Sequence, residues 1–395
     1  MILAVQILFW SSLVALFYTY IGYPLLVYLV SSLRPLKVKR SNIEPTVTVI
    51  ITAYNEEKDI RTKLENTRQI DYPKDKMDIL VASDGSTDKT DEIVKEFANQ
   101  GVKLFRQEGR VGKTTTQNNA VALATGEIIL FSDATTMYQP NVLTEMLPSF
   151  ADESVGCVAG KLIYVDAGET SIGKGAKSYW NYETFLKENE SRACSLIGAS
   201  GCLYAIRREA YKPMYAEACS DFLIATVMYE QGLRTVYEPN AICIEETNNQ
   251  SNKEMRMRVR IISQTITDLW RNRKMMNPFR SGFYAIELFS HKLLRYSVPI
   301  FLILTFLSNA FLAFSSDTFQ LFFLLQLGFY AMAFLAWICE RNGVGLGILT
   351  IPLYFTLANL ASLIGFYKFL TGERYARWEP IRESEDEAKI YQQTI

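Results

Sequence analysis

The chain has 395 residues, of which 49% are hydrophobic and 21% are charged, and its formal net charge at pH 7 is −1. This length suggests two to three structural units, and the near-neutral charge excludes a strongly basic nucleic-acid binder. Six cysteines and one histidine, with no CxxC pair, argue against a structural zinc site. Scattered cysteines of this kind are typical of a reducing compartment.

Charged residues are absent from four long stretches of the chain. These stretches are 1–33, 296–316, 318–339 and 342–367. An uncharged run of about 20 residues can cross the hydrocarbon core of a bilayer. We therefore expect one water-soluble domain, bracketed by an N-terminal anchor over 1–33 and about three transmembrane helices over 297–370. The alternative is that one of the C-terminal segments is a buried or re-entrant helix.

The anchor is expected to be one long helix, bent near Gly22 and Pro24, and it has no signal-peptide cleavage pattern. A linker over 34–45 follows, with four basic residues near its start: Arg34, Lys37, Lys39 and Arg40. The positive-inside rule places this linker in the cytoplasm. The sequence thus predicts an integral protein of the plasma or inner membrane with a cytoplasmic soluble domain. The charged tail, 371–395, has residues of both signs, so its side of the membrane is left open.

The soluble domain, 46–252, alternates short apolar runs with helical patterns. Strands are expected over 46–53, 77–83, 102–105 and 127–131, and helices over 59–69, 88–99 and 114–125. This alternation is typical of βαβ units with a mainly parallel sheet. The predicted fold class is therefore α/β.

Polar residues follow three of the four predicted strands. They are Tyr54 to Glu56, Asp84 to Ser86, and Asp133. Open α/β sheets bind ligands at the carboxyl ends of their strands, and carboxylates there can accept hydrogen bonds from a base or ribose, or hold a divalent cation. The chain has neither a Walker A motif nor a GxGxxG motif, which argues against kinase, ATPase and NAD-binding functions. We therefore expect a nucleotide with a diphosphate as the ligand.

Four segments in order, VTVIITAYNEE, DGSTDKT, GKTTTQNNA and GEIILFSDATT, resemble the inverting nucleotide-sugar glycosyltransferases of family 2, which have the GT-A fold. The flanking apolar segments resemble the membrane branch of that family, which includes chitin-oligosaccharide, hyaluronan, cellulose and poly-N-acetylglucosamine synthases. The resemblance implies a hexosyltransferase that moves a sugar from a nucleotide-sugar, by family habit a UDP-sugar, to a growing glycan or lipid-linked saccharide. The expected partners are this donor, this acceptor and membrane lipids, with no nucleic acid.

The resemblance also implies roles for individual residues on the donor side. The implied nucleotide contacts are Ala53, Tyr54, Glu56, Asp84, Lys113 and Asp133. Asp133 occupies the first position of the family's Asp-x-Asp metal motif, but the third position is Thr135. A divalent cation, Mg²⁺ or Mn²⁺, is therefore implied, with Asp133 as its ligand, since magnesium often uses only one or two carboxylates.

On the acceptor side, Asp221 matches the family's catalytic base, which takes the proton of the acceptor hydroxyl. The alternative for Asp221 is a helix N-cap. The small-residue loop Gly198, Ala199, Ser200 and Gly201 resembles the segment beside the acceptor sugar, and its alternative is a plain tight turn. Trp180 either stacks on a sugar or packs in the core.

Residues 253–296 are expected to form amphipathic helices at the membrane surface, or alternatively a basic solvated helix. Arg258 and Arg260 are implied diphosphate contacts, with lipid headgroup contact as the alternative. Of the Gln-x-x-Arg-Trp motif of processive members only Arg260 is present, which argues against processive polymerisation. Two further functions stay open. One is sugar transfer to a polyprenyl phosphate held by Arg256, Arg258, Arg260 or Arg271, and the other is a non-catalytic nucleotide-binding membrane module.

Overall fold

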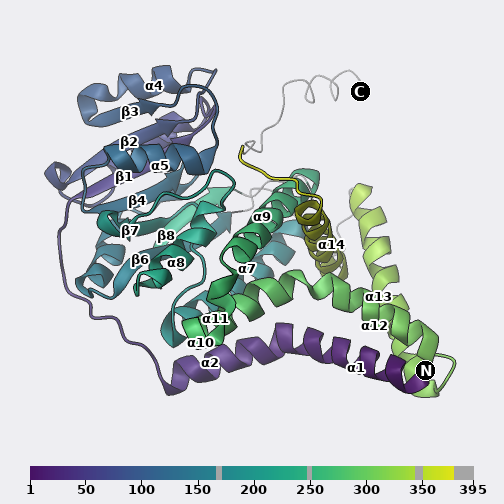
Figure 1. Ribbon diagram of the computed structural model, residues 1–395. Helices are drawn as coiled ribbons and strands as arrows, with labels where there is room; N and C mark the ends of the chain where they lie inside the picture. Colours follow the sequence, from purple (N-terminus) through teal and green to yellow (C-terminus); the bar gives the residue numbers. More distant parts are fainter. Residues whose placement is uncertain (166–170, 247–250, 343–349, 378–395) are drawn as a thin grey trace, which may run out of the picture.

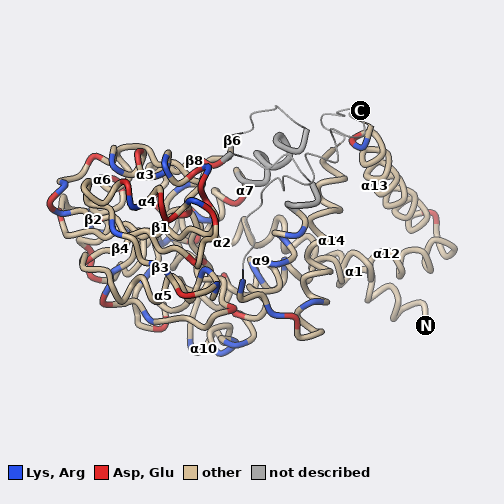
Figure 2. The backbone as a smooth tube through the Cα atoms, turned by 90° about the horizontal axis from the view of Figure 1, so that it is seen from above, with Lys and Arg blue, Asp and Glu red and all other residues tan. Residues whose placement is uncertain are grey.

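The computed structural model describes residues 1–165, 171–246, 251–342 and 350–377, and it leaves out the side chains at 165–180 and 246–254. Figure 1 shows an α/β half and a helical half, with α1 and α2 running along the lower edge of the molecule. Seen from above in Figure 2, the charged residues gather on the α/β half, whereas α1, α12 and α13 are nearly free of them. This division confirms the predicted combination of an α/β domain with terminal apolar helices.

The α/β half is built on one eight-stranded sheet with the order β3-β2-β1-β4-β7-β6-β8-β5. Its strands are β1 (Val47–Ala53), β2 (Met77–Ser83), β3 (Val102–Arg106), β4 (Ile128–Asp133), β5 (Met137–Tyr138), β6 (Val155–Val165), β7 (Tyr204–Arg207) and β8 (Arg234–Glu246). The pairs among β3, β2, β1 and β4 are parallel, as predicted, and β6 is also parallel to β8. β7 is antiparallel to both of its neighbours, and β5 is antiparallel to β8. The sheet is therefore mixed but mainly parallel.

Helices cover both faces of the sheet, which is why β1 is buried along its whole length. Val49 and Ile51 pack with α3 (Ile60–Arg68), α4 (Thr90–Glu96) and α6 (Val142–Met146). Ile50 points to the other face and packs with α5 (Lys113–Leu123) and α8 (Ser220–Glu230). A strand between two apolar layers needs an unbroken run of β-branched residues, which its sequence VTVIITA provides.

Two long helices connect the α/β half to the membrane half. α7 (Ser171–Ala193) packs against α2 (Tyr23–Leu33), and α9 (Ser251–Arg271) packs against α14 (Thr350–Leu370). Val259, Ile262 and Ile266 of α9 form one buried cluster with Ala361 of α14. The apolar face predicted for the membrane surface is therefore largely covered by the protein's own helix.

Among the residues that the structure describes, three helical segments are long and apolar enough to cross a membrane: Ile2–Leu33, Asp317–Arg341 and Thr350–Leu370. The first consists of α1 (Ile2–Phe17), a π-helical turn η1 (Tyr18–Gly22) and α2, so a π-helical turn is found where a bend was expected. The other two are α13 and α14. The length and composition of these helices are those of membrane-spanning segments.

The predicted span over 297–316 contains a shorter helix in the structure. α12 (Val298–Leu312) has only 15 residues, and it joins the preceding helical segment, Phe283–Leu294, at an angle of 58°. That segment consists of α11 (Phe283–Glu287) and the π-helical η7 (Leu288–Leu294). Pro299 in the first turn of α12 lacks the N–H that a continuous helix would need. The pair forms either a broken span, which keeps the predicted crossing, or a re-entrant loop, which is the alternative that the sequence left open.

The remaining described helices are short connectors. They are α10 (Pro278–Ser281) and the 3-10 turns η2 (Lys74–Lys76), η3 (Ala98–Gln100), η4 (Leu147–Ala151), η5 (Arg208–Ala210) and η6 (Arg273–Met276).

Candidate functional site

The strand register brings three predicted polar loops to one edge of the sheet. Ala53, the last residue of β1, is paired with Ser83 of β2, and Thr52 is paired with Asp133 of β4. Parallel strands in register end together, so Tyr54, Asp84 and Asp133 all leave the sheet at its carboxyl edge. This is the edge at which open α/β sheets bind ligands.

Asp84 is completely buried and organises the loop that leads into α5. Its carboxylate accepts hydrogen bonds from the backbone N–H groups of Val111, at 2.8 Å, and Gly112, at 3.0 Å, and from the Thr116 hydroxyl, at 2.9 Å. Gly112 has a φ of +98°, a conformation that favours glycine. Asp84 therefore positions the backbone directly before Lys113.

The loop after β1 is tied to the loop after β2. Asn55, in the left-handed region with a φ of 54°, donates from its backbone N–H to Ser86 Oγ and accepts at Oδ1 from the Thr87 N–H, at 2.7 Å. The Tyr54 ring lies beneath the Arg110 guanidinium, 4.0 Å from centroid to carbon. Glu56 is buried, and its N–H donates to the Thr90 hydroxyl.

Lys113 lies between the loop before α5, residues 107–112 (the donor loop), and the loop Gly198–Gly201 (the acceptor loop). Its Nζ forms an ion pair with Asp133, and the Lys113 and Asp133 side chains are 23% and 32% exposed, so both are open to a ligand. A Cβ at Gly201 would lie 3.2 Å from Asp221 Oδ2 and 3.6 Å from Lys113 Nζ. Removal from water lowers the pKa of Lys113, but Asp133 and Asp221 outweigh this and hold the pKa above its usual value. The side chains of Lys113, Asp133 and Asp221 therefore meet beside Gly201.

Asp221 is not the N-cap of α8, so that alternative is wrong. The N-cap is Cys219, and no side chain caps this helix. Asp221 is half-buried in the first turn, where its Oδ1 accepts a hydrogen bond from Cys219 Sγ at 3.1 Å. Its backbone carbonyl accepts from the Ala199 N–H at 2.8 Å, which joins α8 to the loop Gly198–Gly201. The other carboxylate oxygen, Oδ2, faces this loop, since a Cβ at Gly201 would lie 3.2 Å from it.

The turn before α8 is held by two other elements. Thr114 Oγ1 of α5 donates to the Ala218 carbonyl at 2.8 Å, and Asp268 of α9 accepts from the Cys219 N–H at 3.0 Å. Asp268 also accepts from the Tyr215 hydroxyl, and burial raises its pKa to about 8. Sequence reasoning missed Asp268, because no motif marks it and only the packing of α9 brings it here.

A second carboxylate, Glu245 of β8, lies near Asp133 and was also missed. β5 pairs antiparallel with β8, with Met137 opposite Ile244, so the end of β8 lies beside the residues that follow β4. Burial and then Asp133 raise the pKa of Glu245 to about 7, while Lys113 and hydrogen bonds from Tyr164 and Thr135 oppose the shift. Within the described residues no three His, Cys, Asp or Glu side chains form a metal cluster.

Asp133 and Glu245 nevertheless fit a divalent cation of the Mg²⁺ or Mn²⁺ type. Such cations take oxygen ligands and commonly use one or two carboxylates, together with substrate phosphates and water. The donor set is therefore adequate with a diphosphate present, although the Asp-x-Asp motif is incomplete.

The two predicted arginines point to different partners. Arg258 donates to the Tyr354 hydroxyl of α14 and lies 5.1 Å from its ring centroid. Burial and the Asp221 carboxylate raise the pKa of the Cys219 thiol, and the positive charge of Arg260 opposes this rise. Arg260 is thus on the Asp221 side of α9, and Arg258 contacts the membrane helix.

The segment 371–377, after α14, lies against the donor loop. Gln264 of α9 donates to the Tyr375 carbonyl at 2.8 Å, and a Cβ at Gly112 would overlap the Ala376 carbonyl oxygen. Figure 1 shows this segment leaving α14 and running toward the α/β half. Glycine at position 112 is therefore favoured both by the positive φ and by the close approach of Ala376.

The acceptor loop, Gly198–Gly201, packs against the residue after Asp221. A Cβ at Gly198 would lie 3.2 Å from Phe222 Cδ2, so the loop approaches α8 closely at this point. Trp180 lies in α7, but its side chain is outside the described residues. Its predicted role stays a prediction.

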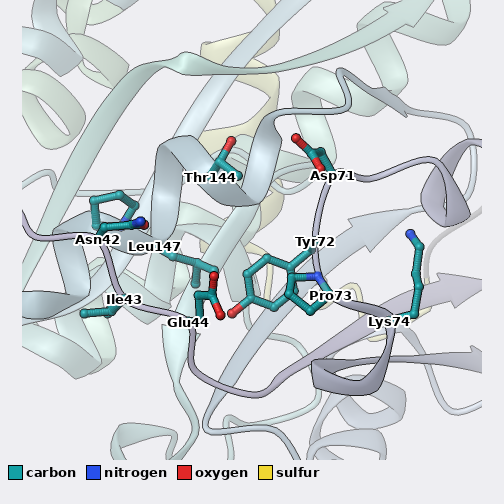
Figure 3. Close-up of a pocket in the computed structure, with 10 residues that line it drawn as sticks. Asn42, Ile43, Glu44, Asp71, Tyr72, Pro73, Lys74, Thr144 and Leu147 are labelled. Carbon is teal, nitrogen blue, oxygen red and sulfur yellow. The ribbon is translucent and has the colours of Figure 1, made fainter.

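The pocket drawn in Figure 3 is distinct from this site. It has a volume of about 510 Å³ and is lined by residues that include Glu44, Tyr72, Lys74 and Leu147. Glu44 precedes β1, and Tyr72 and Lys74 precede β2, so this pocket lies at the amino edge of the sheet. We assign it no part in the chemistry of the carboxyl edge.

Comparison with known proteins gives the same domain. Residues 48–214 match the family described as glycosyl transferase family 2. A beta-monoglucosyldiacylglycerol synthase from Nostoc sp. is 27% identical over 170 residues, 42% of this chain and 36% of the relative. Probable glycosyltransferase YdaM from Bacillus subtilis is 34% identical over 134 residues, 32% of each chain. The chain thus spans about a third of the length of these relatives.

A solved structure extends the likeness to most of the chain. The mannosyltransferase PcManGT from Pyrobaculum calidifontis, in complex with GDP-Man and Mn²⁺, has a TM-score of 0.70 and 24% identity. The likeness covers 91% of this chain and 98% of that one. At this identity the likeness establishes the fold alone. Together with the family match, it shows that the chain carries a glycosyl transferase family 2 domain with the GT-A fold.

Proposed function

We propose that the protein is a membrane-embedded inverting glycosyltransferase that moves a sugar from a nucleotide-sugar, a UDP-sugar by family habit, to a glycan or lipid-linked acceptor. The observation that carries the proposal is the convergence of Lys113, Asp133 and Asp221 at the carboxyl edge of the sheet. This convergence places a cation that can bind a diphosphate, Lys113, close to a carboxylate that faces the acceptor loop, Asp221.

Asp221 is the catalytic base in this proposal. It takes the proton of the acceptor hydroxyl while that oxygen attacks the anomeric carbon of the sugar and the bond to the diphosphate breaks. A pure helix cap would have its carboxylate engaged with its own backbone, whereas Asp221 is hydrogen-bonded to the Cys219 thiol and lies beside Gly201. The position of the Asp221 carboxylate beside the acceptor loop supports its role as the base.

Lys113 and Arg260 neutralise the charge that develops on the leaving diphosphate. Asp133, with Glu245 beside it, would hold a divalent cation, which as a Lewis acid supplies further stabilisation of that charge. Asp84 orders the loop that presents Lys113, and Tyr54 with Arg110 borders the position of the nucleobase. Ala53 ends β1 in register with Ser83, and the buried Glu56 holds the following turn through its hydrogen bond to Thr90.

The acceptor and the orientation are further parts of the proposal. The name of the Nostoc relative, beta-monoglucosyldiacylglycerol synthase, supports a lipid acceptor, and the two helices that link the site to the apolar half support entry from the membrane. The four basic residues after Leu33 support a cytoplasmic position for the site.

The test is nucleotide release by the full-length protein in nanodiscs. UDP-, GDP- and dTDP-sugars are supplied in turn with Mg²⁺ or Mn²⁺ and total membrane lipid. We expect release with one donor, a loss of at least a hundredfold in Asp221→Asn, and no change in Asp75→Asn, which removes an exposed carboxylate outside the site. Nucleotide binding without release from any donor would favour a non-catalytic binding module instead.

A further inference from the structure

The start of α8, the helix that carries Asp221, is held by a residue of another helix. Cys219, the N-cap of α8, has no side-chain cap bond. Its backbone N–H donates to Asp268 Oδ2 of α9 at 3.0 Å, and its carbonyl accepts from the Leu223 N–H at 2.8 Å. Asp221 lies two residues after Cys219, in the same turn. The contact with Asp268 therefore fixes the backbone from which the Asp221 carboxylate projects.

Asp268 is completely buried, and each of its carboxylate oxygens accepts a hydrogen bond. Oδ2 binds the Cys219 N–H, and Oδ1 binds the hydroxyl of Tyr215. One carboxylate thus joins two points of segment 215–219, which leads into α8. A buried N–H that loses its acceptor is costly, so this segment depends on Asp268 for its position.

Two further residues of α9 contact the same segment. Gln264 Nε2 donates to the Glu217 carbonyl at 3.4 Å, and Arg271 lies 3.6 Å from the Glu217 carboxylate and 4.0 Å from the ring centroid of Tyr215. Gln264, Asp268 and Arg271 are spaced four and three residues apart, so they lie on one face of the helix. The apolar residues of α9 pack against α14. α9 therefore connects the membrane half to the segment that leads into Asp221.

We propose that Asp268 is a positioning residue for sugar transfer: by holding the Cys219 N–H, it sets the direction from which the Asp221 carboxylate meets the acceptor hydroxyl. This inference rests on the proposed function and adds a residue to its acceptor side. Asp268 takes no proton from the acceptor and acts only through Asp221. Such placement matters to the rate, because a misplacement of about 1 Å can cost roughly a hundredfold.

The test compares full-length variants in nanodiscs with the donor identified by nucleotide release. In Asp268→Ala we expect kcat, expressed per molecule that binds nucleotide, to fall about ten- to a hundredfold. Affinity for the nucleoside diphosphate of that donor should be unchanged, because Asp84 holds the donor loop independently. A residue with only a general structural role would lower the amount of folded protein and leave this kcat unchanged, so a wild-type kcat in Asp268→Ala overturns the inference.

Two companion variants separate the lost hydrogen bond from other effects. Asp268→Asn keeps an oxygen that can accept from the Cys219 N–H, so it should restore most of the rate. Asp78→Ala is the matched control, because Asp78 also accepts two hydrogen bonds, from the Thr48 and Thr125 hydroxyls at 2.8 and 3.1 Å. Asp78 lies at the start of β2, at the opposite edge of the sheet, and its loss should leave kcat unchanged.

Tyr215→Phe provides a milder perturbation of the same contact. It leaves Asp268 in place and removes only the hydroxyl that binds its Oδ1, so kcat should fall several-fold at unchanged nucleotide affinity. This variant decides alone if Asp268→Ala does not fold, and a wild-type kcat in it would then overturn the inference. Absence of nucleotide release from every donor in the wild-type protein contradicts the proposed function itself, so the two failures are distinguishable.

Discussion

Replacing Asp84 by Asn tests whether this buried carboxylate holds the donor loop. Its Oδ1 accepts three hydrogen bonds, from the Val111 and Gly112 N–H groups and the Thr116 hydroxyl, and its Oδ2 accepts a second one from Gly112. An Asn with its oxygen in the Oδ1 position keeps three neutral bonds. Its NH₂ group then faces the Gly112 N–H, so that one acceptor is replaced by a donor.

The cost follows from these contacts. Losing one charge-assisted hydrogen bond and weakening three others is expected to destabilise the closed loop by about 1.5–3 kcal/mol. Since each 1.4 kcal/mol corresponds to about a factor of ten, the loop should open roughly 10- to 150-fold more often. Hydrogen exchange of a peptide covering 107–116, followed by mass spectrometry, measures this opening directly.

The control and the refuting result use the same assay. Asp75→Asn removes an exposed carboxylate outside the donor loop and should leave exchange in 107–116 unchanged. Because Lys113 directly follows the loop, affinity for the donor nucleotide should also fall in Asp84→Asn. If the peptide exchanged at the wild-type rate in Asp84→Asn, the carboxylate would not be what orders this loop.

Two further predictions concern the C-terminal segment and the core. Gly112→Ala introduces a Cβ that overlaps segment 371–377, so trypsin should release the C-terminal peptide several-fold faster. Gly101→Ala is the control, because Gly101 has a similar positive φ but open space around it, and it should leave the rate of release unchanged. Equal rates of release in the two variants would contradict the contact. Burial lowers the pKa of Lys63 from 10.5 to about 7, so between these values the unfolded chain binds a proton that the native state does not, and stability should rise with pH across this window. Lys63→Met should remove this contribution, and thermal unfolding at pH 7, 8 and 9 measures it. If stability rose with pH as steeply in the variant as in the wild type, the assignment to Lys63 would be refuted.

Local patterns were sufficient for the donor half of the site. A strand buried on both faces, such as β1, needs a continuous β-branched run, and the polar residues that follow it, such as Tyr54, are adjacent in the chain. Because parallel strands end at one edge, the clustering of Asp84 and Asp133 followed from the order of the elements alone. The fold class and the apolar segments were predictable for the same reason, since each depends on residues close together in sequence.

The acceptor side depended on packing between distant segments. Glu245 reaches Asp133 because β8 pairs with β5, and Asp268 reaches the turn before Asp221 because α9 packs between α8 and α14. Neither of these approaches has a local signature. Composition likewise could not separate a full span from the bent pair that ends in α12, because hydropathy records how apolar a segment is and not the direction in which its helix runs. Sequence thus determined which residues leave the sheet together, and only the tertiary structure decided what faces them.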